Sequence, residues 1–288
     1  SLASSRYGGR MIKAETNPIG IDVDKFASTM RKSSVRAKMV DYLDKWRGCK
    51  VILGIDRLDY IKGVPQKLLA FEHFLKTHPE WRDKVVLVQI AIPSRTDVLE
   101  YQNLRSLVHQ LVGRINGEFG SLGQTPVNWL DQSIPFDNMC ALMAISDVCF
   151  VTSLRDGMNL VSFEYIACQV KHKDKSWPGH DRGCGVLLLS ELAGAAQCLG
   201  AGAVIVNPYD CEDCVSALEK CLTMDGEDRA AMTSYAESYV NRYTAQHWAT
   251  TFVDSLDAIT SDEARAAVRA DNLFPTPLDT DGALVAMV

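Results

Sequence analysis

The sequence predicts an α/β protein built on a doubly wound, parallel β-sheet of the Rossmann-like type. Six short apolar runs alternate with stretches in which apolar residues recur at helical spacing. No turn typical of a β-hairpin joins one run to the next, so parallel strands with right-handed crossover helices are expected. The predicted strands are residues 50–55, 85–92, 127–130, 148–152, 185–189 and 203–206.

The first part of the chain, residues 1–48, is predicted to be a remnant strand and a linker helix from a preceding amino-terminal domain. Residues 9–15 have a strand-like pattern that Pro18 ends, and residues 22–43 have apolar residues at helical spacing after an acidic cap. A strand without neighbours cannot bury both faces, which suggests a severed domain edge. A disordered leader is the alternative.

The central domain is predicted to span residues 49–259. Its strands are expected to be joined by helices and by a charged surface loop at residues 171–183. Residues 260–288 are low in aromatic residues and are predicted to be a C-terminal tail. The expected helices of the domain are residues 64–78, 97–116, 139–145, 212–222 and 228–259.

Composition excludes several classes of partner. With a net charge of −6 and no long basic block, neither nucleic acid nor an anionic membrane is expected as a partner. No stretch approaches the roughly 20 apolar residues that a membrane helix needs. The nine cysteines are scattered through mostly apolar runs, which favours free thiols in a reducing compartment and a cytoplasmic protein.

Two common phosphate-binding motifs and a metal motif are also absent or weak. The sequence has no G-x-G-x-x-G fingerprint after its first strand, so no dinucleotide cofactor is expected. It has no G-x-x-x-x-G-K-[ST] loop either, so a P-loop nucleotidase is not expected. Cys211 and Cys214 have C-x-x-C spacing, but no second ligand pair accompanies them. A helix-opening turn is the better interpretation there.

Residues 155–164, RDGMNLVSFE, follow the strand at 148–152 and open a helix. Ligands of open α/β sheets bind at the carboxyl ends of strands, and the amides of a first helical turn favour an anion. Asp156 lies at the strand end, and Glu164 lies further along the helix. An ordinary βα turn without a ligand is the alternative.

A second loop, residues 54–63 (GIDRLDYIKG), follows the first strand of the domain. Its two cations, Arg57 and Lys62, can together neutralise a diphosphate, the guanidinium by forked hydrogen bonds and the ammonium as a point charge. The alternative is a solvated loop in which Arg57 pairs with Asp56 or Asp59.

These two motifs, together with residues 92–97 (IPSRTD) and 113–117 (GRING), closely resemble trehalose-6-phosphate synthases, the retaining glycosyltransferases of family 20. The resemblance covers about residues 8–259. It implies a GT-B arrangement, in which two Rossmann-like domains face each other across a cleft. The chain is similar to the carboxyl-terminal, UDP-glucose-binding half of that arrangement.

The resemblance implies roles for the charged residues of both loops. Arg57 and Lys62 would hold the diphosphate of UDP-glucose and, with Asp156, form the catalytic set. Asp156 would accept hydrogen bonds from glucose hydroxyls, and Glu164 would bind the ribose diol.

Other residues take their roles from the same resemblance. Ile134 would contact uracil through its backbone, and Arg95 would reach the phosphate of the acceptor, glucose 6-phosphate. Backbone amides would face sugar and phosphate at Gly157, Met158, Asn159, Leu160 and Val161.

The implied reaction is glucosyl transfer with retention from UDP-glucose to glucose 6-phosphate, giving trehalose 6-phosphate and UDP, with no metal and no cofactor. The amino-terminal half is not matched, so this half is expected to bind the donor and to be inactive alone. A homo-oligomer or a trehalose-synthesis complex is compatible with the resemblance. The alternative is a non-catalytic, UDP-glucose-binding regulatory subunit of such a complex, although such a subunit would be expected to lose Arg57, Lys62, Asp156 or Glu164.

Overall fold

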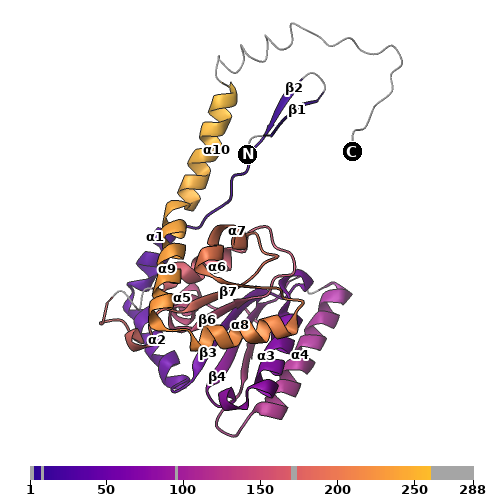
Figure 1. Cartoon of the computed structure of the whole chain (residues 1–288), viewed down its shortest axis with the longest axis vertical. Helices are drawn as coiled ribbons and strands as arrows, with labels where there is room; N and C mark the ends of the chain where they lie inside the picture. The colour runs from indigo at the N-terminus through magenta and orange to yellow at the C-terminus, as the bar shows by residue number, and fades with distance from the viewer. Residues whose placement is uncertain (1–2, 8–9, 95–96, 170–173, 261–288) are drawn as a thin grey trace. The chain divides into compact units, whose positions relative to one another are not determined.

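The computed structural model describes residues 3–7, 10–94, 97–169 and 174–260. Contacts divide the chain into a large unit, Gly20–Thr244, and a second unit made from the chain ends, Ser1–Ile19 and Ala245–Val288. The large unit contains the sheet and most of the helices (Figure 1).

A six-stranded parallel sheet forms the centre of the large unit, as predicted. Its strand order is β5-β4-β3-β6-β7-β8, the Rossmann order in which the chain starts in the middle and builds outward in both directions. The switch point lies between β3 and β6, where Ile52 is in register with Val148. The strands are β3 (Lys50–Arg57), β4 (Val85–Ile92), β5 (Val127–Leu130), β6 (Val148–Val151), β7 (Val186–Ser190) and β8 (Val204–Val206).

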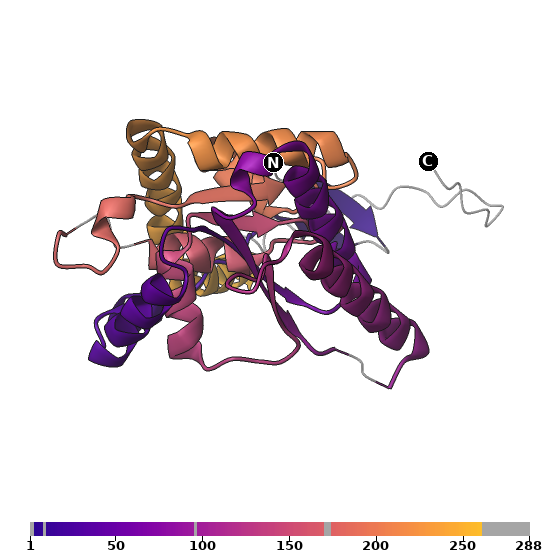
Figure 2. The ribbon, with the colours of Figure 1, turned by 90° about the horizontal axis from the view of Figure 1, so that it is seen from below.

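Helices cover both faces of the sheet and bury two separate cores (Figures 1 and 2). Because successive side chains of a strand point to opposite faces, Val51 and Leu53 enter one core while Ile52 enters the other. The Ile52 core is closed by α3 (Val64–Thr77), α4 (Leu99–Phe119) and α8 (Cys211–Thr223). The other is closed by α1 (Val23–Met30), α2 (Ser33–Lys45), α5 (Phe136–Ile145), α6 (Leu160–Cys168), α7 (Ala195–Leu199) and α9 (Gly226–Arg242).

Two predicted helices are each broken into two. The helix expected over residues 22–43 is interrupted at Lys32, whose backbone is extended with ψ 136°, so α1 and α2 are separate. The helix expected over residues 228–259 is interrupted at Tyr243, which leaves the helical conformation before α10 (Ala245–Thr260) begins. In both cases the apolar spacing continues across a break that only the backbone reveals.

The amino-terminal segment differs more clearly from the prediction. Strand β2 (Arg10–Ala14) pairs antiparallel with β1 (Ala3–Tyr7) in a two-stranded sheet. The expectation of a strand without a neighbour is therefore wrong. The partner was missed because residues 3–7 are mostly small and polar and lack the alternation typical of strands.

Helices α1 and α2, predicted as a linker, pack within the large unit. Phe26, Met30, Val35 and Met39 are each 4% exposed or less and belong to one core. Phe26 also packs edge-on against Phe136 of α5, with ring centroids 5.1 Å apart. The predicted domain limits at residues 49 and 259 stay a prediction.

Three findings bear on the remaining expectations about composition. All nine cysteines are free thiols, and Cys211 and Cys214 open helix α8, with Asp210 as its cap. Within the described ranges no three metal-ligating side chains cluster together. No helix in the described part of the chain combines the length and apolarity needed to cross a membrane.

Candidate functional site

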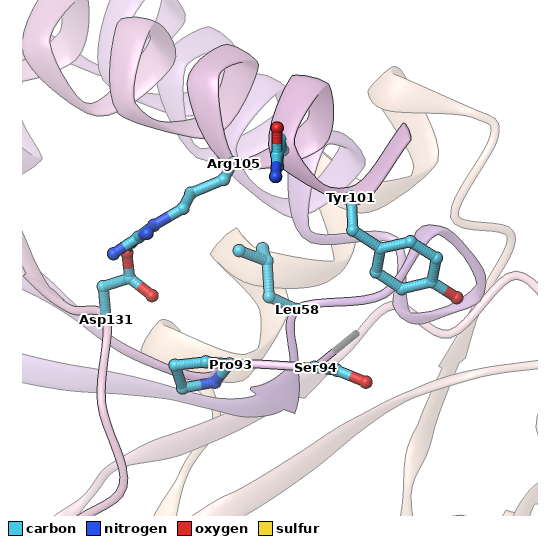
Figure 3. A pocket seen from close by; sticks show the side chains of 7 residues that line it. Leu58, Pro93, Ser94, Tyr101, Arg105 and Asp131 are labelled. Carbon is cyan, nitrogen blue, oxygen red and sulfur yellow. Dashed lines mark hydrogen bonds and ion pairs between the residues drawn. The ribbon is translucent and has the colours of Figure 1, made fainter. Parts of the chain in front are cut away.

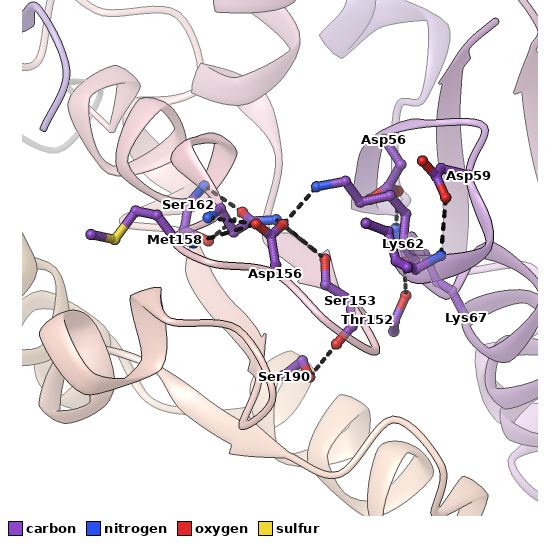
Figure 4. A network of polar contacts seen from close by, with 12 residues as sticks. Asp56, Asp59, Lys62, Lys67, Thr152, Ser153, Asp156, Met158, Ser162 and Ser190 are labelled. Carbon is purple, nitrogen blue, oxygen red and sulfur yellow. Dashed lines mark hydrogen bonds and ion pairs between the residues drawn. The ribbon is translucent and has the colours of Figure 1, made fainter. Parts of the chain in front are cut away.

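The candidate site lies at the carboxyl ends of β3 and β6, the two strands that meet at the switch point of the sheet. In open α/β sheets, ligands bind outside the carboxyl ends of the strands at such a switch point. Here the two loops that follow these strands are residues 58–63 and residues 152–159, and both carry charged side chains (Figure 4).

The loop after β3 is a tight turn that ends on a glycine. The Asp59 carboxylate accepts a hydrogen bond from the amide of Ile61 at 3.3 Å and so caps the short helix η1 (Tyr60–Lys62). Gly63 then adopts the left-handed conformation with φ 66°. A Cβ atom there would lie 2.0 Å from the carbonyl oxygen of Thr152, so this close approach requires glycine.

Hydrogen bonds to backbone carbonyls join the two loops. The amide of Leu154 donates to the carbonyl of Ile61 at 2.7 Å, and the Thr152 hydroxyl donates to the carbonyl of Gly63 at 2.9 Å. These bonds set the distance between the loops, and Lys62 is held opposite Asp156.

Lys62 and Asp156 form an ion pair across the switch point (Figure 4), with Nζ and Oδ2 2.6 Å apart and each side chain 14% exposed. The Asp156 carboxylate also accepts from the amides of Met158 and Asn159, from the Asn159 side chain at 3.1 Å and from the Ser153 hydroxyl. Burial acts to raise the pKa of Asp156, but the hydrogen bond and charge of Lys62 outweigh it and the pKa is lowered. Asp156 is therefore an anion at neutral pH.

Asn159 connects the ion pair to helix α6. Among the described residues other than glycine it is the one with a positive φ, at 68°. Its side-chain oxygen caps the helix by accepting from the Ser162 amide at 3.2 Å, while its side-chain nitrogen donates to Asp156. The cost of the left-handed backbone is thus offset by a cap and by a fixed carboxylate.

A third loop supports the Asp156 segment from behind. The amide of Gly194 donates to the Asp156 carbonyl at 2.9 Å, and the amide of Ala195 donates to the Met158 carbonyl at 2.7 Å. The Ser190 hydroxyl donates to the Ser153 carbonyl at 2.6 Å (Figure 4). The backbone around the carboxylate is consequently fixed on two sides.

Arg57 ends β3, and its side chain is exposed. The alternative interpretation, in which Arg57 pairs with Asp56 or Asp59, does not describe the structure. Asp56 is buried and bonds to the buried Lys67 at 2.6 Å, and Asp59 caps the turn. Within the described ranges no carboxylate is paired with the Arg57 guanidinium, which leaves its donors available to a ligand.

Glu164 lies in the second turn of α6, half-buried. Burial raises the pKa of this carboxyl to about 7, an effect that the charge of Lys25 only partly opposes. No hydrogen bond to its carboxylate is found among the residues that the structure describes. Both oxygens can therefore accept bonds from a ligand.

The remaining predicted residues are distributed around the same edge of the sheet. Ile134 is half-buried in the connection between β5 and α5, and Leu160 and Val161 are the first two residues of α6. The amides of a first helical turn have no partner within their own helix. Arg95 lies outside the described residues.

Sequence reasoning missed the residues that position Asp156. The side chains of Ser153 and Asn159 both contact its carboxylate, yet only the backbone amide of Asn159 was expected to contribute. A usable signal was present, because asparagine just before a helix is a preferred cap. Nothing in the sequence indicates the contact of Ser153.

A small pocket lies between the end of β4, helix α4 and the end of β5 (Figure 3). Arg105 and Asp131 form an ion pair at its wall. With a volume of about 30 Å³ it holds one or two water molecules and no sugar or nucleotide. This pocket is therefore not proposed as the donor site. The pocket is lined by Leu58, Pro93, Ser94, Tyr101, Gln102, Arg105 and Asp131.

Comparison with known proteins identifies the family. The profile described as glycosyltransferase family 20 matches residues 1–258. The chain belongs to glycosyltransferase family 20. The predicted resemblance is thereby confirmed, and so is the fold class, a Rossmann-like domain of GT-B type, since solved family members share it.

Two solved structures and one curated relative illustrate the similarity to this family 20 chain. The α,α-trehalose-phosphate synthase (UDP-forming) of Candida albicans is 53% identical over 251 residues, which are 87% of this chain and 50% of that protein. A synthase from Burkholderia xenovorans in complex with glucose-6-phosphate is 34% identical with a TM-score of 0.81, covering 89% of this chain and 54% of that one. An E. coli structure bound with UDP-2-fluoro glucose is 34% identical with a TM-score of 0.80, covering 88% and 56%. The chain thus spans about half the length of the relatives that it matches.

Proposed function

We propose that this chain is the UDP-glucose-binding half of a UDP-forming α,α-trehalose-phosphate synthase. One observation carries the proposal: a cation and a carboxylate meet at the switch point of the sheet, with Lys62 Nζ and Asp156 Oδ2 2.6 Å apart. The family supports the same activity, because the C. albicans relative is named as a UDP-forming synthase.

The side chains fit the parts of a nucleotide sugar in turn. The diphosphate binds Arg57 and Lys62, and glucose hydroxyls donate to Asp156. The ribose diol donates to Glu164, whose carboxylate has two acceptor oxygens. Ile134 meets uracil through its backbone. Along the whole of UDP-glucose, charges thus face charges of opposite sign, and hydrogen-bond donors face acceptors.

The helix start completes the donor site. Amides at Gly157, Met158, Asn159, Leu160 and Val161 belong to or precede the first turn of α6, where an anion is stabilised. In the free chain the amides of Met158 and Asn159 are bonded to Asp156. The amides of the next residues are therefore the ones best suited to phosphate.

The reaction follows from this arrangement. The bond between the anomeric carbon and the UDP oxygen breaks while the acceptor hydroxyl oxygen bonds to the same face of that carbon. The acceptor proton passes to an oxygen of the departing phosphate. Arg57 and Lys62 stabilise the negative charge that develops on UDP by electrostatic attraction. Asp156 holds the sugar in position.

The acceptor, glucose 6-phosphate, binds largely on a second domain that faces this one, with Arg95 reaching its phosphate. The Burkholderia xenovorans relative binds glucose-6-phosphate and is about twice as long as the part that matches here. We therefore expect this chain to bind the donor without turnover until the other half is supplied.

The first prediction concerns Arg57. Replacing Arg57 by Ala removes charge-assisted hydrogen bonds to the diphosphate and should weaken UDP binding about tenfold to a hundredfold. Isothermal titration calorimetry of the 288-residue chain with UDP, UDP-glucose and GDP-glucose measures this, and both uridine ligands should bind better than GDP-glucose.

Arg47→Ala is the matched control, because Arg47 is 81% exposed and pairs with Asp44 beside helix α2. It should bind UDP as the unchanged chain does. Unchanged UDP affinity in Arg57→Ala, or no binding of either uridine ligand to the unchanged chain, would contradict the proposal.

A further inference from the structure

We propose that the Lys62–Asp156 ion pair discriminates against UDP without glucose, so that the site holds the donor and expels the product. This inference rests on the proposed function, because it concerns how the same site treats the two uridine ligands. Besides binding glucose, the Asp156 carboxylate would compete with the diphosphate for the Lys62 ammonium.

The Asp156 carboxylate is fully satisfied in the free chain. Its Oδ1 accepts from two backbone amides, and its Oδ2 accepts from Lys62, Asn159 and Ser153. Lys62 is the one cation that contacts it among the described residues, and both side chains are only 14% exposed. Water can therefore replace the Lys62 ammonium only poorly.

The two partners of the ion pair differ in how freely they can move. The Asp156 backbone is bonded to Gly194, and its carboxylate is bonded to the amides of Met158 and Asn159. The backbone of Lys62 is fixed as well, but its four-carbon stem is flexible. When a diphosphate binds, the Lys62 ammonium turns toward it, whereas the Asp156 carboxylate keeps its position.

UDP and UDP-glucose then differ in their effect on the Asp156 carboxylate, which has lost its ion pair with Lys62. UDP draws Lys62 away and supplies nothing in return, so a half-buried carboxylate faces the anionic phosphates at short range. The loss of the Lys62–Asp156 ion pair and the repulsion between the carboxylate and the phosphates both oppose the binding of UDP. UDP-glucose carries hydroxyls that donate to the carboxylate and replace the lost ammonium.

The ion pair would therefore promote the release of UDP once glucose has been transferred. While glucose is attached, the ligand satisfies Lys62 and Asp156 together. After transfer the glucose hydroxyls leave with the new product. UDP and Asp156 then compete for Lys62, which favours return of the ion pair and departure of UDP.

The test replaces Asp156 by Asn, which keeps the shape and removes the charge. We expect UDP to bind about tenfold more tightly, because the competitor and the like charge are both lost. The preference for UDP-glucose over UDP should fall at least tenfold. Calorimetry at pH 8 with both ligands measures the two constants on the same preparation.

Asp44→Asn is the matched control, because it removes one carboxylate from an exposed ion pair with Arg47, 2.7 Å long, outside the site. It should change neither affinity. If Asp156→Asn does not fold, as judged by circular dichroism, Asp156→Ser removes the same charge and should give the same result. Unchanged or weaker UDP binding in the folded variant would overturn the inference.

A double variant separates the two causes. With Lys62 replaced by Met, no cation remains to compete for, so Asp156→Asn should tighten UDP binding by about threefold or less in that background. An undiminished gain would show that Lys62 is not involved and would also overturn the inference. Failure of the proposed function would look different, because the unchanged chain would then bind neither uridine ligand.

Discussion

At the scale of single residues, Glu164 has a titration that its surroundings move into the physiological range. Its carboxyl is half-buried on helix α6, and burial raises its pKa to about 7. An ionised carboxylate offers two acceptor oxygens to a ribose diol, whereas protonation turns one of them into a donor. The site should therefore respond to pH close to neutrality.

We expect the affinity for UDP-glucose to fall about tenfold between pH 8 and pH 6, because ionised Glu164 falls from most of the population to a small part. UDP-glucose is the suitable ligand, since its phosphates stay ionised over this range. Calorimetry across the range measures the effect. Glu164→Gln should bind more weakly at pH 8 and show no such decline. A decline that persists in Glu164→Gln would assign it to another group.

The same residue affects stability with the opposite sign. In the unfolded chain Glu164 loses its proton near its ordinary pKa of 4.5, whereas the folded chain keeps the proton up to about pH 7. The folded state therefore loses stability as pH rises between these values, by about 3 kcal/mol. Urea unfolding of Glu164→Gln should lack this loss.

At the scale of elements, the site depends on how β3 leads into α3. Asp56 near the end of the strand is bonded to Lys67 of the helix, and both side chains are at most 2% exposed. Gln89 of β4 adds a hydrogen bond to Asp56 at 3.0 Å. This buried pair fixes the two ends of the loop that carries Lys62. Breaking such a pair by removing one partner leaves an unpaired buried charge and is strongly destabilising.

Gly63 provides the sharpest test of the loop. An Ala at Gly63 must accept a φ of 66° and a Cβ atom 2.0 Å from the Thr152 carbonyl oxygen. We expect Gly63→Ala to lower the free energy of unfolding by about 3 kcal/mol or more, and to weaken UDP binding because Lys62 is displaced. Urea unfolding and calorimetry measure the two effects.

Gly48→Ala is the control, since Gly48 also has a positive φ, 81°, but no atom lies within 4 Å of an added Cβ. Gly48→Ala should lower the free energy of unfolding by about 1 kcal/mol, because of its backbone conformation alone, and leave UDP binding unchanged. Equal losses in the two variants would mean that the close approach to Thr152 is unimportant.

The elements also show what the sequence could predict. All six central strands were predictable, because buried parallel strands are continuous apolar runs bounded by polar loops. The breaks at Lys32 and Tyr243 were not, because apolar spacing continues across them. The site was predictable as two strand ends. The pairing of Lys62 with Asp156 was not, because it depends on strand order, which local sequence does not specify.

At the scale of the whole molecule, helices α1 and α2 decide where the folding unit begins. The buried residues Phe26, Met30, Val35 and Met39 belong to one of the two cores. Burying each contributes about 1.5–3 kcal/mol, so their sum rivals the total stability of a typical domain.

We therefore expect a fragment of residues 20–259 to unfold cooperatively and a fragment of residues 49–259 to be unfolded or aggregated. Urea unfolding followed by circular dichroism compares the two. Cooperative unfolding of the shorter fragment would support the domain limit predicted from the sequence and would show that α1 and α2 are dispensable.

Lys62 and Asp156 are 94 residues apart in sequence, although their side chains touch. Contacts this distant in the chain form late in folding, because a long loop must close before they contribute. The backbone hydrogen bonds within a helix such as α4 join residues four apart in the sequence, so a helix can form early. The proposed affinity for UDP would therefore arise only when both halves of the sheet have joined. During synthesis on the ribosome, the helices would form first, and the proposed UDP site would be completed last.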